Sequence, residues 1–370
     1  MKVMHSSRLF IILLLLLGLS LGCEEKNQPT ADPASSATAG NKNKGLVDNK
    51  VKAAMEDVKA DPSAAVANNG PPPTGIFPAG DGAKALARDG KLNLVDEGTG
   101  AKVKVDGYGA IGGAFLLQVA QSSQPGGTRP MVDYTFEVRG PKAEKGDGAE
   151  AAPSATAAIP VSFVIAKAKP SQTQQGQLPE GFDKMISSVE GSRFDMKLAP
   201  NGAFTEIKTI YGKGLDQAVM REFVDMARAA LTLFFPPMPK EQVGKGSYWI
   251  MGDEANLEGM NLIRYRVTKL TEVQDELLTF EIDVRHYVAD PFQVPNAARG
   301  KGLAAQAFQG PSKGVVMRKK GSFIPDQAEV VSQMVVYLAD PEKPQQAQPF
   351  QFSLQARLAG PKPAEEPAPK

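Results

Sequence analysis

The sequence is short of the side chains that common hydrolytic enzymes use for their chemistry. Among 370 residues there are one cysteine, two histidines and one tryptophan. A single cysteine excludes a disulfide within the chain, so a folded domain must be held together by its apolar core. Positive and negative charges are nearly balanced, with 42 Lys and Arg and 41 Asp and Glu. This balance gives no reason to expect nucleic-acid binding.

Residues 1–22 have the pattern of a secretory signal peptide. Lys2 and Arg8 precede an uninterrupted apolar run over residues 9–17, which is too short to span a bilayer comfortably. Small residues follow, and Cys23 stands where a bacterial lipoprotein carries its acylated cysteine. Removal of residues 1–22 takes away two basic and no acidic residues, so 40 basic residues then face 41 acidic ones, a net charge of about −1.

Lipidation of Cys23 is therefore our first functional prediction. Leu21 and Gly22 fit the lipobox pattern, while Ser20 stands where leucine is commoner. Acyl chains contribute about 0.8 kcal/mol per buried methylene, so a multiply acylated cysteine would hold the protein on a membrane without a spanning helix. The alternative is ordinary signal-peptide cleavage beside an incidental cysteine. Glu24 follows the cysteine, and in the enterobacterial sorting rule this indicates the outer membrane of the cell envelope.

Composition divides the rest of the chain into a linker, one large domain and a tail. Residues 23–75 are rich in Ala, Asn, Lys, Pro and Ser, which predicts a disordered tether behind the lipid anchor. A coil of about 50 residues would place its ends ~40 Å apart and lift a domain clear of the bilayer. A globular domain is expected over residues 76–360, and a disordered tail rich in Pro and Ala over residues 361–370.

The hydrophobic pattern predicts a mostly β domain built around one helix. Apolar residues recur at helical spacing from Leu215 to Phe234, and Pro236-Pro237 ends that pattern. Alternating apolar and polar residues predict strands before and after it, most clearly over 278–288 and 350–358. The expected fold class is α+β, mostly β: a large curved antiparallel sheet whose strands each have one polar face, with a long amphipathic helix packed on the apolar face.

No catalytic constellation emerges from the sequence. His286 is the one histidine beyond the signal peptide, and it lies on the apolar side of its predicted strand, which favours a histidine satisfied at the edge of the core over a catalytic base. No Gly-x-Ser-x-Gly elbow accompanies it. Residues 107–112 match the dinucleotide pattern GxGxxG, but a β-like segment follows where a helix is needed. We therefore expect no enzyme activity and no cofactor.

Two charged groups also have ordinary interpretations. Asp253, Glu254 and Glu258 form a small acidic group whose spacing does not match a calcium loop, so we expect solvated surface and no metal site. The Arg-Lys-Lys run at 318–320 has the chemistry to touch lipid head groups, but a solvated strand end is the simpler interpretation.

Several segments together resemble uncharacterised bacterial envelope lipoproteins. The segments that carry the resemblance are 188–194, Asn201-Gly202, the predicted helix, 235–239 and the Val-Gly-x-Gly-x-x-Trp pattern of 243–249, while 83–87 and 94–98 are similar to the start of the domain in myxobacterial members. The resemblance covers about residues 80–290. It implies a signal peptide, an Ala- and Pro-rich spacer and a large β-rich domain of unknown function, and it implies no catalytic residue.

Two functions remain open for such a protein. The first is a non-catalytic structural or interaction role, in which the anchored domain presents loops 140–158 and 289–314 to an envelope protein. The alternative is a carrier or binding module for a lipid or another hydrophobic ligand. The candidate pocket of such a carrier lies between helix and sheet and would be lined by Met220, Phe223, Phe234, Phe235 and Trp249. The competing interpretation is that these five residues simply fill the core.

Overall fold

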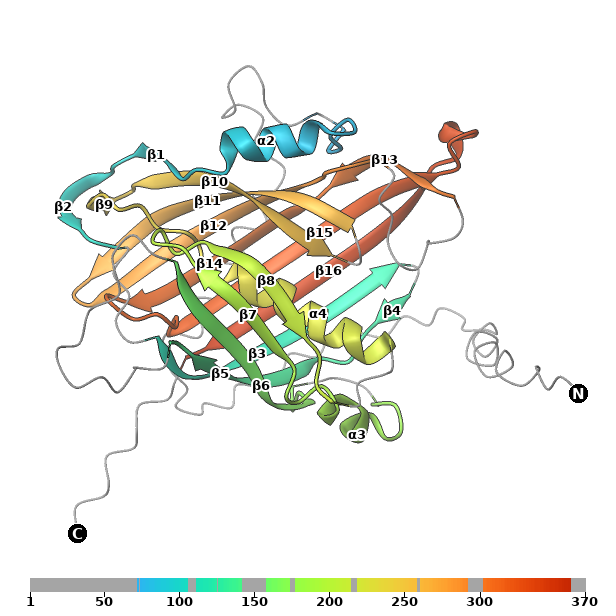
Figure 1. The fold of residues 1–370 in the computed structure, drawn as a ribbon, viewed down its shortest axis with the longest axis horizontal. Coiled ribbons are helices and arrows are strands. Elements are labelled where there is room, and N and C mark those ends of the chain that lie inside the picture. Colours follow the sequence, from blue (N-terminus) through green and yellow to red (C-terminus); the bar gives the residue numbers. More distant parts are fainter. Residues whose placement is uncertain are drawn as a thin grey trace, which may run out of the picture. The chain divides into compact units, whose positions relative to one another are not determined.

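The computed structural model describes most of the predicted globular domain. The described residues are 72, 74–105, 111–124, 126–141, 158–173, 177–213, 218–257, 260–291 and 302–360. The predicted signal peptide, Cys23, nearly all of the predicted linker and the predicted tail lie outside the described residues. All described residues fall in one compact unit, which is mostly β, with one large antiparallel sheet and three α-helices among them (Figure 1).

The elements follow one another as long strands interrupted by short helices. Their order is α2 (Asp81–Asp89), β1 (Asn93–Asp96), β2 (Thr99–Val103), β3 (Gly112–Gln124), β4 (Gly127–Thr128), β5 (Val132–Arg139), β6 (Ile159–Pro170), α3 (Phe182–Ser187), β7 (Arg193–Leu198), β8 (Phe204–Ile210), α4 (Ala218–Leu233), β9 (Val243–Lys245), β10 (Tyr248–Leu257), β11 (Met260–Gln274), β12 (Leu277–Val288), β13 (Ala304–Gln309), β14 (Pro311–Lys319), β15 (Gln327–Ala339), the 3₁₀ turn η4 (Pro344–Gln346) and β16 (Gln348–Ala359).

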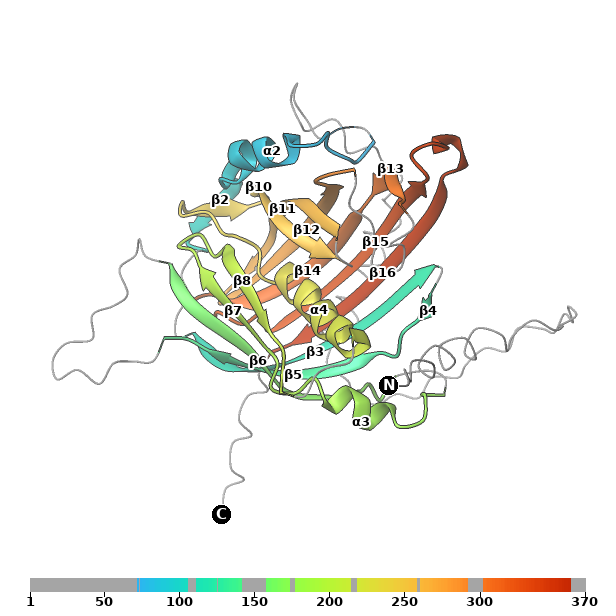
Figure 2. The same ribbon diagram turned by 45° about the vertical axis from the view of Figure 1, so that its right-hand side comes forward.

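Fourteen strands form the large sheet, in the order β1-β10-β11-β12-β14-β15-β16-β3-β5-β6-β7-β8, with β13 beside β15 and β4 beside β3 (Figure 2). Strands β2 and β9 form a separate pair. The expectation of one large antiparallel sheet is confirmed. Among the described residues the sheet is open and not curled, with β1 and β8 as its two end strands, so the expected curved form is not supported.

The strand patterns read from the sequence are largely confirmed. Strand β12 buries alternate side chains from Leu278 to Val288, and β16 buries alternate ones from Phe350 to Leu358. Strands β7 and β8 pair as a hairpin, and Gly202 adopts a φ of 78° in its turn, a conformation that glycine reaches without steric cost. Period-two alternation identifies these strands because one of their faces meets the apolar core.

Helix α4 is shorter than expected. It spans 16 residues, whereas the pattern from Leu215 to Phe234 predicted a long helix, and the segment 214–217 lies outside the described residues. The helix ends at Leu233 because Pro236 and Pro237 cannot donate backbone hydrogen bonds and the first disfavours helix in the residue before it. Val219 belongs to the apolar residues at helical spacing that predicted the buried face, yet it is 52% exposed.

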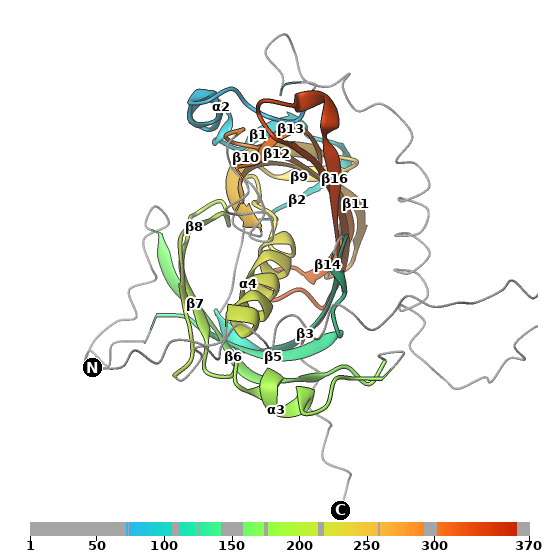
Figure 3. The ribbon, with the colours of Figure 1, turned by 90° about the vertical axis from the view of Figure 1, so that its right-hand side faces the viewer.

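The buried face of α4 packs on strands that are distant in sequence. The helix contacts β3, β10 and β16, and its buried side chains share one core cluster with residues of β3, β5, β6, β7, β12 and β16. The hydroxyl of Tyr134 on β5 donates a 3.0 Å hydrogen bond to the carbonyl of Phe223. In Figure 3, α4 lies with β7 and β8 on one side and β3 and β14 on the other. The helix therefore connects β10 to β3 and β16, two strands with which β10 does not pair.

The opposite face of β10 and β11 is covered by α2. Phe77 and Ala85 pack there against Ile263 and Tyr265, and the Tyr265 hydroxyl donates a 2.7 Å hydrogen bond to the carboxylate of Asp89. The prediction of one polar face for each strand is therefore wrong for β11, because neighbouring elements bury both of its faces. The alternate side chains of this strand, including two arginines, point toward α4 instead of toward water.

Candidate functional site

A cavity of about 880 Å³ lies beside the C-terminal half of α4. Its wall is built from α2, α4 and strands β3, β8, β10, β11, β12, β15 and β16. Pockets that hold small molecules usually enclose about 300–1,000 Å³, so this volume is sufficient for one. No helix among the described residues is both long and apolar enough to cross a membrane.

Part of the cavity lies at an open edge of the sheet. Strand β1 pairs with only the first residues of β10, Tyr248 to Ile250. Within the described part of the chain, the rest of β10 therefore has a strand neighbour only in β11. Residues 251–256 of β10 and 204–207 of β8 both line the cavity. The two end regions of the sheet thus contribute walls to the same space.

The lining combines apolar side chains with a similar number of polar and charged ones. Its apolar side chains include Ile207, Leu233, Met251, Leu262, Met334 and Phe352. Its polar side chains include Gln121, Thr232, Asp253, Arg264, His286 and Ser332. In such a wall, apolar contact would give a bound molecule affinity and the polar groups would fix its orientation.

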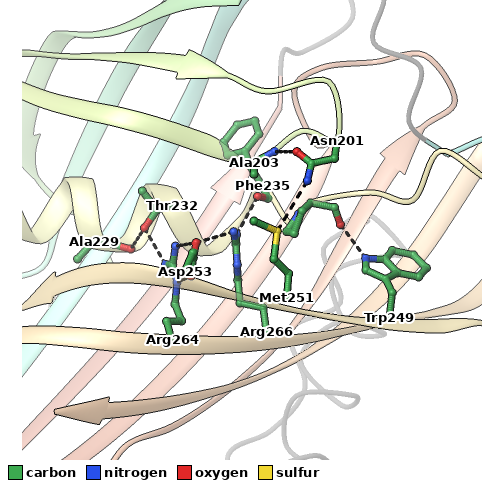
Figure 4. Close-up of polar contacts among 11 residues, drawn as sticks. Asn201, Ala203, Ala229, Thr232, Phe235, Trp249, Met251, Asp253, Arg264 and Arg266 are labelled. Atoms are coloured by element: carbon green, nitrogen blue, oxygen red, sulfur yellow. Dashed lines mark hydrogen bonds and ion pairs between the residues drawn. The ribbon is translucent and has the colours of Figure 1, made fainter. Parts of the chain in front are cut away.

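An ion cluster of Asp253, Arg264 and Arg266 forms the most strongly charged part of the site (Figure 4). The β10–β11 register places Asp253 directly opposite Arg264. Arg264 donates from Nε and Nη2 to the two carboxylate oxygens at 2.8 and 2.7 Å, and Arg266 donates from Nη2 to Oδ2 at 2.6 Å. This paired geometry is the strong form of the arginine–carboxylate interaction.

Helix α4 and the chain after it hold the two guanidinium groups from the other side. Arg264 donates from Nη1 to the hydroxyl of Thr232 at 3.0 Å, and Thr232 in turn donates to the carbonyl of Ala229. Arg266 donates from Nη1 to the carbonyl of Phe235 at 3.2 Å. The side chains of Arg264 and Arg266 are only 4% and 2% exposed, so both guanidinium groups are almost completely removed from water.

The carboxylate of the cluster is ionised at neutral pH. Burial raises the pKa of a carboxyl group, but the positive charges of Arg264 and Arg266 outweigh this effect and hold the pKa of Asp253 below its ordinary value. Two guanidinium ions and one carboxylate carry a net charge of +1 among the three side chains.

His286 on β12 lines the cavity near this cluster. Burial first, and then the positive charge of Arg264, lower the pKa of its imidazole to about 4, so the ring is neutral at neutral pH. Its Nδ1 lies 3.0 Å from the carbonyl of Gly310, which can only accept, so Nδ1 carries the proton and Nε2 remains an acceptor. The prediction of a satisfied histidine at the edge of the core is confirmed, although the sequence did not indicate a cavity beside it.

The five residues predicted to line a pocket lie in the core instead. Met220, Phe223, Phe234, Phe235 and Trp249 are all buried in the main cluster, and none of them lines this cavity. The Phe235 ring lies 5.2–5.5 Å from the rings of Phe163, Phe204 and Phe323, and Trp249 donates from Nε1 to the carbonyl of Pro237 at 2.7 Å. Side chains fill the helix–sheet interface at these positions, and the cavity opens beyond them.

Two further predictions were wrong because the strands were longer or more deeply packed than expected. Asp253 is not solvated surface, since β10 continues through it and pairs it with β11; Glu254 is exposed, and Glu258 lies outside the described residues. Arg318 does not lie at a solvated strand end. It is buried, it donates to the carbonyl of Val105, and its guanidinium lies 5.8 Å from the ring centroid of Phe280.

The structure bears on two further sequence predictions, the GxGxxG match and the metal site. Residues 106–110 lie outside the described residues, and Gly112 begins strand β3, so no helix follows the glycines to bind a pyrophosphate. Among the described residues, no group of three or more His, Cys, Asp or Glu is arranged to hold a metal ion.

The residues of the ion cluster were missed, although the sequence carried a signal for them. Arg264 and Arg266 lie on one face of their strand, and the residues between and beside them on the other face are apolar. Asp253 lies within reach on the preceding strand if the chain turns near 258–259. Counting outward from such a turn pairs Asp253 with Arg264.

Comparison with known proteins gives no further guidance. No protein-family model matches this sequence, and no curated protein matches it. Function is therefore argued from the cavity and its side chains.

Proposed function

We propose that the protein is a lipid-anchored binding protein of the bacterial cell envelope whose cavity holds a hydrophobic or amphipathic small molecule. The observation that supports this best is the cavity of about 880 Å³ beside α4, whose wall combines apolar side chains with polar and charged ones. The binding role is the alternative of the two functions considered from the sequence, and its proposed site now differs from the five core residues first suggested.

The anchor in this proposal rests on the sequence. The sequence has a signal-like segment over 1–22, then Cys23, and then residues rich in Ala and Pro. This order is typical of a domain that is tethered to a membrane through acyl chains. Outer-membrane placement follows from Glu24 under the enterobacterial rule and belongs to the same proposal.

The competing role, a structural or interaction protein, has less support. It depended on loops 140–158 and 289–314, of which 142–157 and 292–301 lie outside the described residues. It remains a prediction that a protein-interaction experiment would test.

The binding proposal is tested on the mature chain 24–370 produced without its signal, so that no detergent is needed. Native mass spectrometry is expected to find a co-purified amphiphile, and titration with the neutral fluorescent probe N-phenyl-1-naphthylamine is expected to give saturable one-to-one binding. Ala229 lines the cavity, so Ala229→Phe should fill part of it and weaken probe binding about tenfold or more.

Ala218→Phe provides the matched control, because Ala218 lies on the same helix and is exposed. It should leave probe binding unchanged. The absence of both a co-purified ligand and probe binding, or equal binding by the Ala229→Phe variant and the wild type, would refute a ligand site in this cavity.

A further inference from the structure

Positive charge lies in the buried part of the cavity wall. Arg264 lines this wall, and it shares Asp253, its carboxylate partner among the described residues, with Arg266. Burying an ion costs several kcal/mol unless a partner compensates it, so a counter-ion bound beside Arg264 would stabilise its buried and shared charge. Burial is the main cause of the low pKa of His286 on the neighbouring strand, and the positive charge of Arg264 adds to that effect.

Among the described residues, the other acidic side chains of the cavity wall do not cancel the charge of Arg264. Glu206 and Glu254 line the cavity but are exposed, and Glu206 pairs with Lys197 at 2.8 Å. Exposed charges are screened by water and salt over about 8–10 Å, whereas buried ones are screened much less. A ligand group deep in the cavity would therefore be influenced most by Arg264.

Arg264 also has N–H groups that are not used by the described hydrogen bonds. A guanidinium carries five N–H groups. One each on Nε, Nη1 and Nη2 is used by Asp253 or Thr232, which leaves two N–H groups that no described residue accepts. Of the two arginines in the cluster, only Arg264 lines the cavity. Charge and free donors thus coincide at one side chain, and that side chain is already held in place by its other bonds.

Apolar surface continues from this point along the cavity. Leu233 follows Thr232 on α4, and Leu262 and Met251 lie on the same two strands as the ion cluster. An anionic group bound at Arg264 would place an attached hydrocarbon chain against these side chains. The arrangement matches an amphiphile with a negatively charged head.

We infer that the ligand is an anionic amphiphile whose carboxylate or phosphate group binds to the Arg264 guanidinium inside the cavity. This inference rests on the proposed binding function and names the ligand class of the same site.

The test is a competition experiment on the mature chain 24–370 with N-phenyl-1-naphthylamine as the displaced probe. Four competitors share one tail and differ only in the head: dodecanoate, dodecyl phosphate, dodecan-1-ol and dodecylamine, each below its micelle-forming concentration. Hydrogen bonds to charged groups contribute about 1.5–3 kcal/mol, so an anionic head should improve the apparent affinity over the alcohol by ~10- to 100-fold. A preference for dodecanoate or for dodecyl phosphate would distinguish the two anionic heads.

Variants then assign the effect to one side chain. Arg264→Gln should bring the anionic and neutral competitors to within about threefold of each other while still binding the neutral probe. Arg285→Gln is the control, because Arg285 is on the neighbouring strand β12 and pairs with Asp283 outside the cavity lining. It should keep the full preference.

The outcomes separate the inference from the function on which it rests. Equal displacement by all four competitors in the wild type, or strongest displacement by dodecylamine, would overturn the anionic ligand and leave a binding cavity. An anionic preference that persists in Arg264→Gln would overturn the role of this arginine. If neither the probe nor any amphiphile binds, the proposed function itself fails. The wild-type comparison needs no variant, so a folding defect in Arg264→Gln does not prevent the test.

Discussion

Replacement of Asp253 by alanine should destabilise the domain severely. The change leaves Arg264 and Arg266, which are 4% and 2% exposed, without the carboxylate that both of them bind. Breaking a buried ion pair by removing one partner typically costs about 3–5 kcal/mol, because the remaining charge stays buried and uncompensated. We expect a loss of that size in the free energy of unfolding, and Asp253→Asn should lose most of it as well, since it removes the charge at constant size.

The measurement is equilibrium denaturation in urea, followed by the fluorescence of Trp249. This is the only tryptophan in the chain and it is fully buried, so its emission should shift when the core opens. An unfolding entropy of ~2.1 cal/mol/K per residue over residues 72–360 gives about 0.6 kcal/mol/K, so the same loss should lower Tm by about 5–8 °C.

Asp283→Ala is the matched control for this prediction. Asp283 also forms an ion pair on a strand of the same sheet, with Arg285, but both partners are part-exposed. An exposed pair contributes about 0–1 kcal/mol, so the control should lose little stability. If Asp253→Ala costs less than ~1 kcal/mol, or no more than Asp283→Ala, then the buried ion cluster does not hold β10, β11 and α4 together.

Three other predictions concern separate parts of the chain. The pKa of His286 is about 4 in the folded state, against an ordinary value of 6.5. As the pH falls, the unfolded state therefore binds a proton first, and the free energy of unfolding should decrease by up to about 3 kcal/mol between pH 6.5 and 4. His286→Gln should flatten that slope in urea midpoints measured across this range, and an unchanged slope would contradict the shift. Trp249→Phe removes the hydrogen bond to Pro237 and should cost about 1–3 kcal/mol in thermal unfolding followed by circular dichroism; an unaltered Tm would count against it. Cys23→Ala should move the protein from the membrane fraction to the soluble fraction, and continued membrane association would refute lipidation as the anchor.

The strands could be predicted from the sequence wherever one of their faces meets water. In β12, the side chains from Phe280 to Val288 alternate between the core and a more exposed face, as the apolar and polar residues of this segment do in the sequence. The hairpin between β7 and β8 was predictable for the same reason, with Asn201-Gly202 marking its turn. Local pattern and tertiary environment agree in these strands.

The candidate site could not be predicted because it depends on contacts between distant elements. Arg264 looks like an exposed residue until α4 is placed over it, and α2 has to cover Ile263 on the other face. The burial of an arginine is decided by what packs on it, which no local period reveals. The same limit applies to Phe235, whose apolar character is equally compatible with a pocket and with the aromatic cluster in which it lies.

The open sheet has a further consequence for how copies of this protein behave when they are crowded. An unpaired edge strand exposes backbone groups that can pair with another chain and begin aggregation. At the β8 edge, Glu206 adopts a left-handed φ of 52°, and the pairing with β7 shifts register between Asp195 and Lys197. The exposed charge of Glu206 and this local irregularity make β8 a poor template for a second strand. Lipidation would concentrate many copies on one surface, and there the distorted edge would help to keep neighbouring molecules separate.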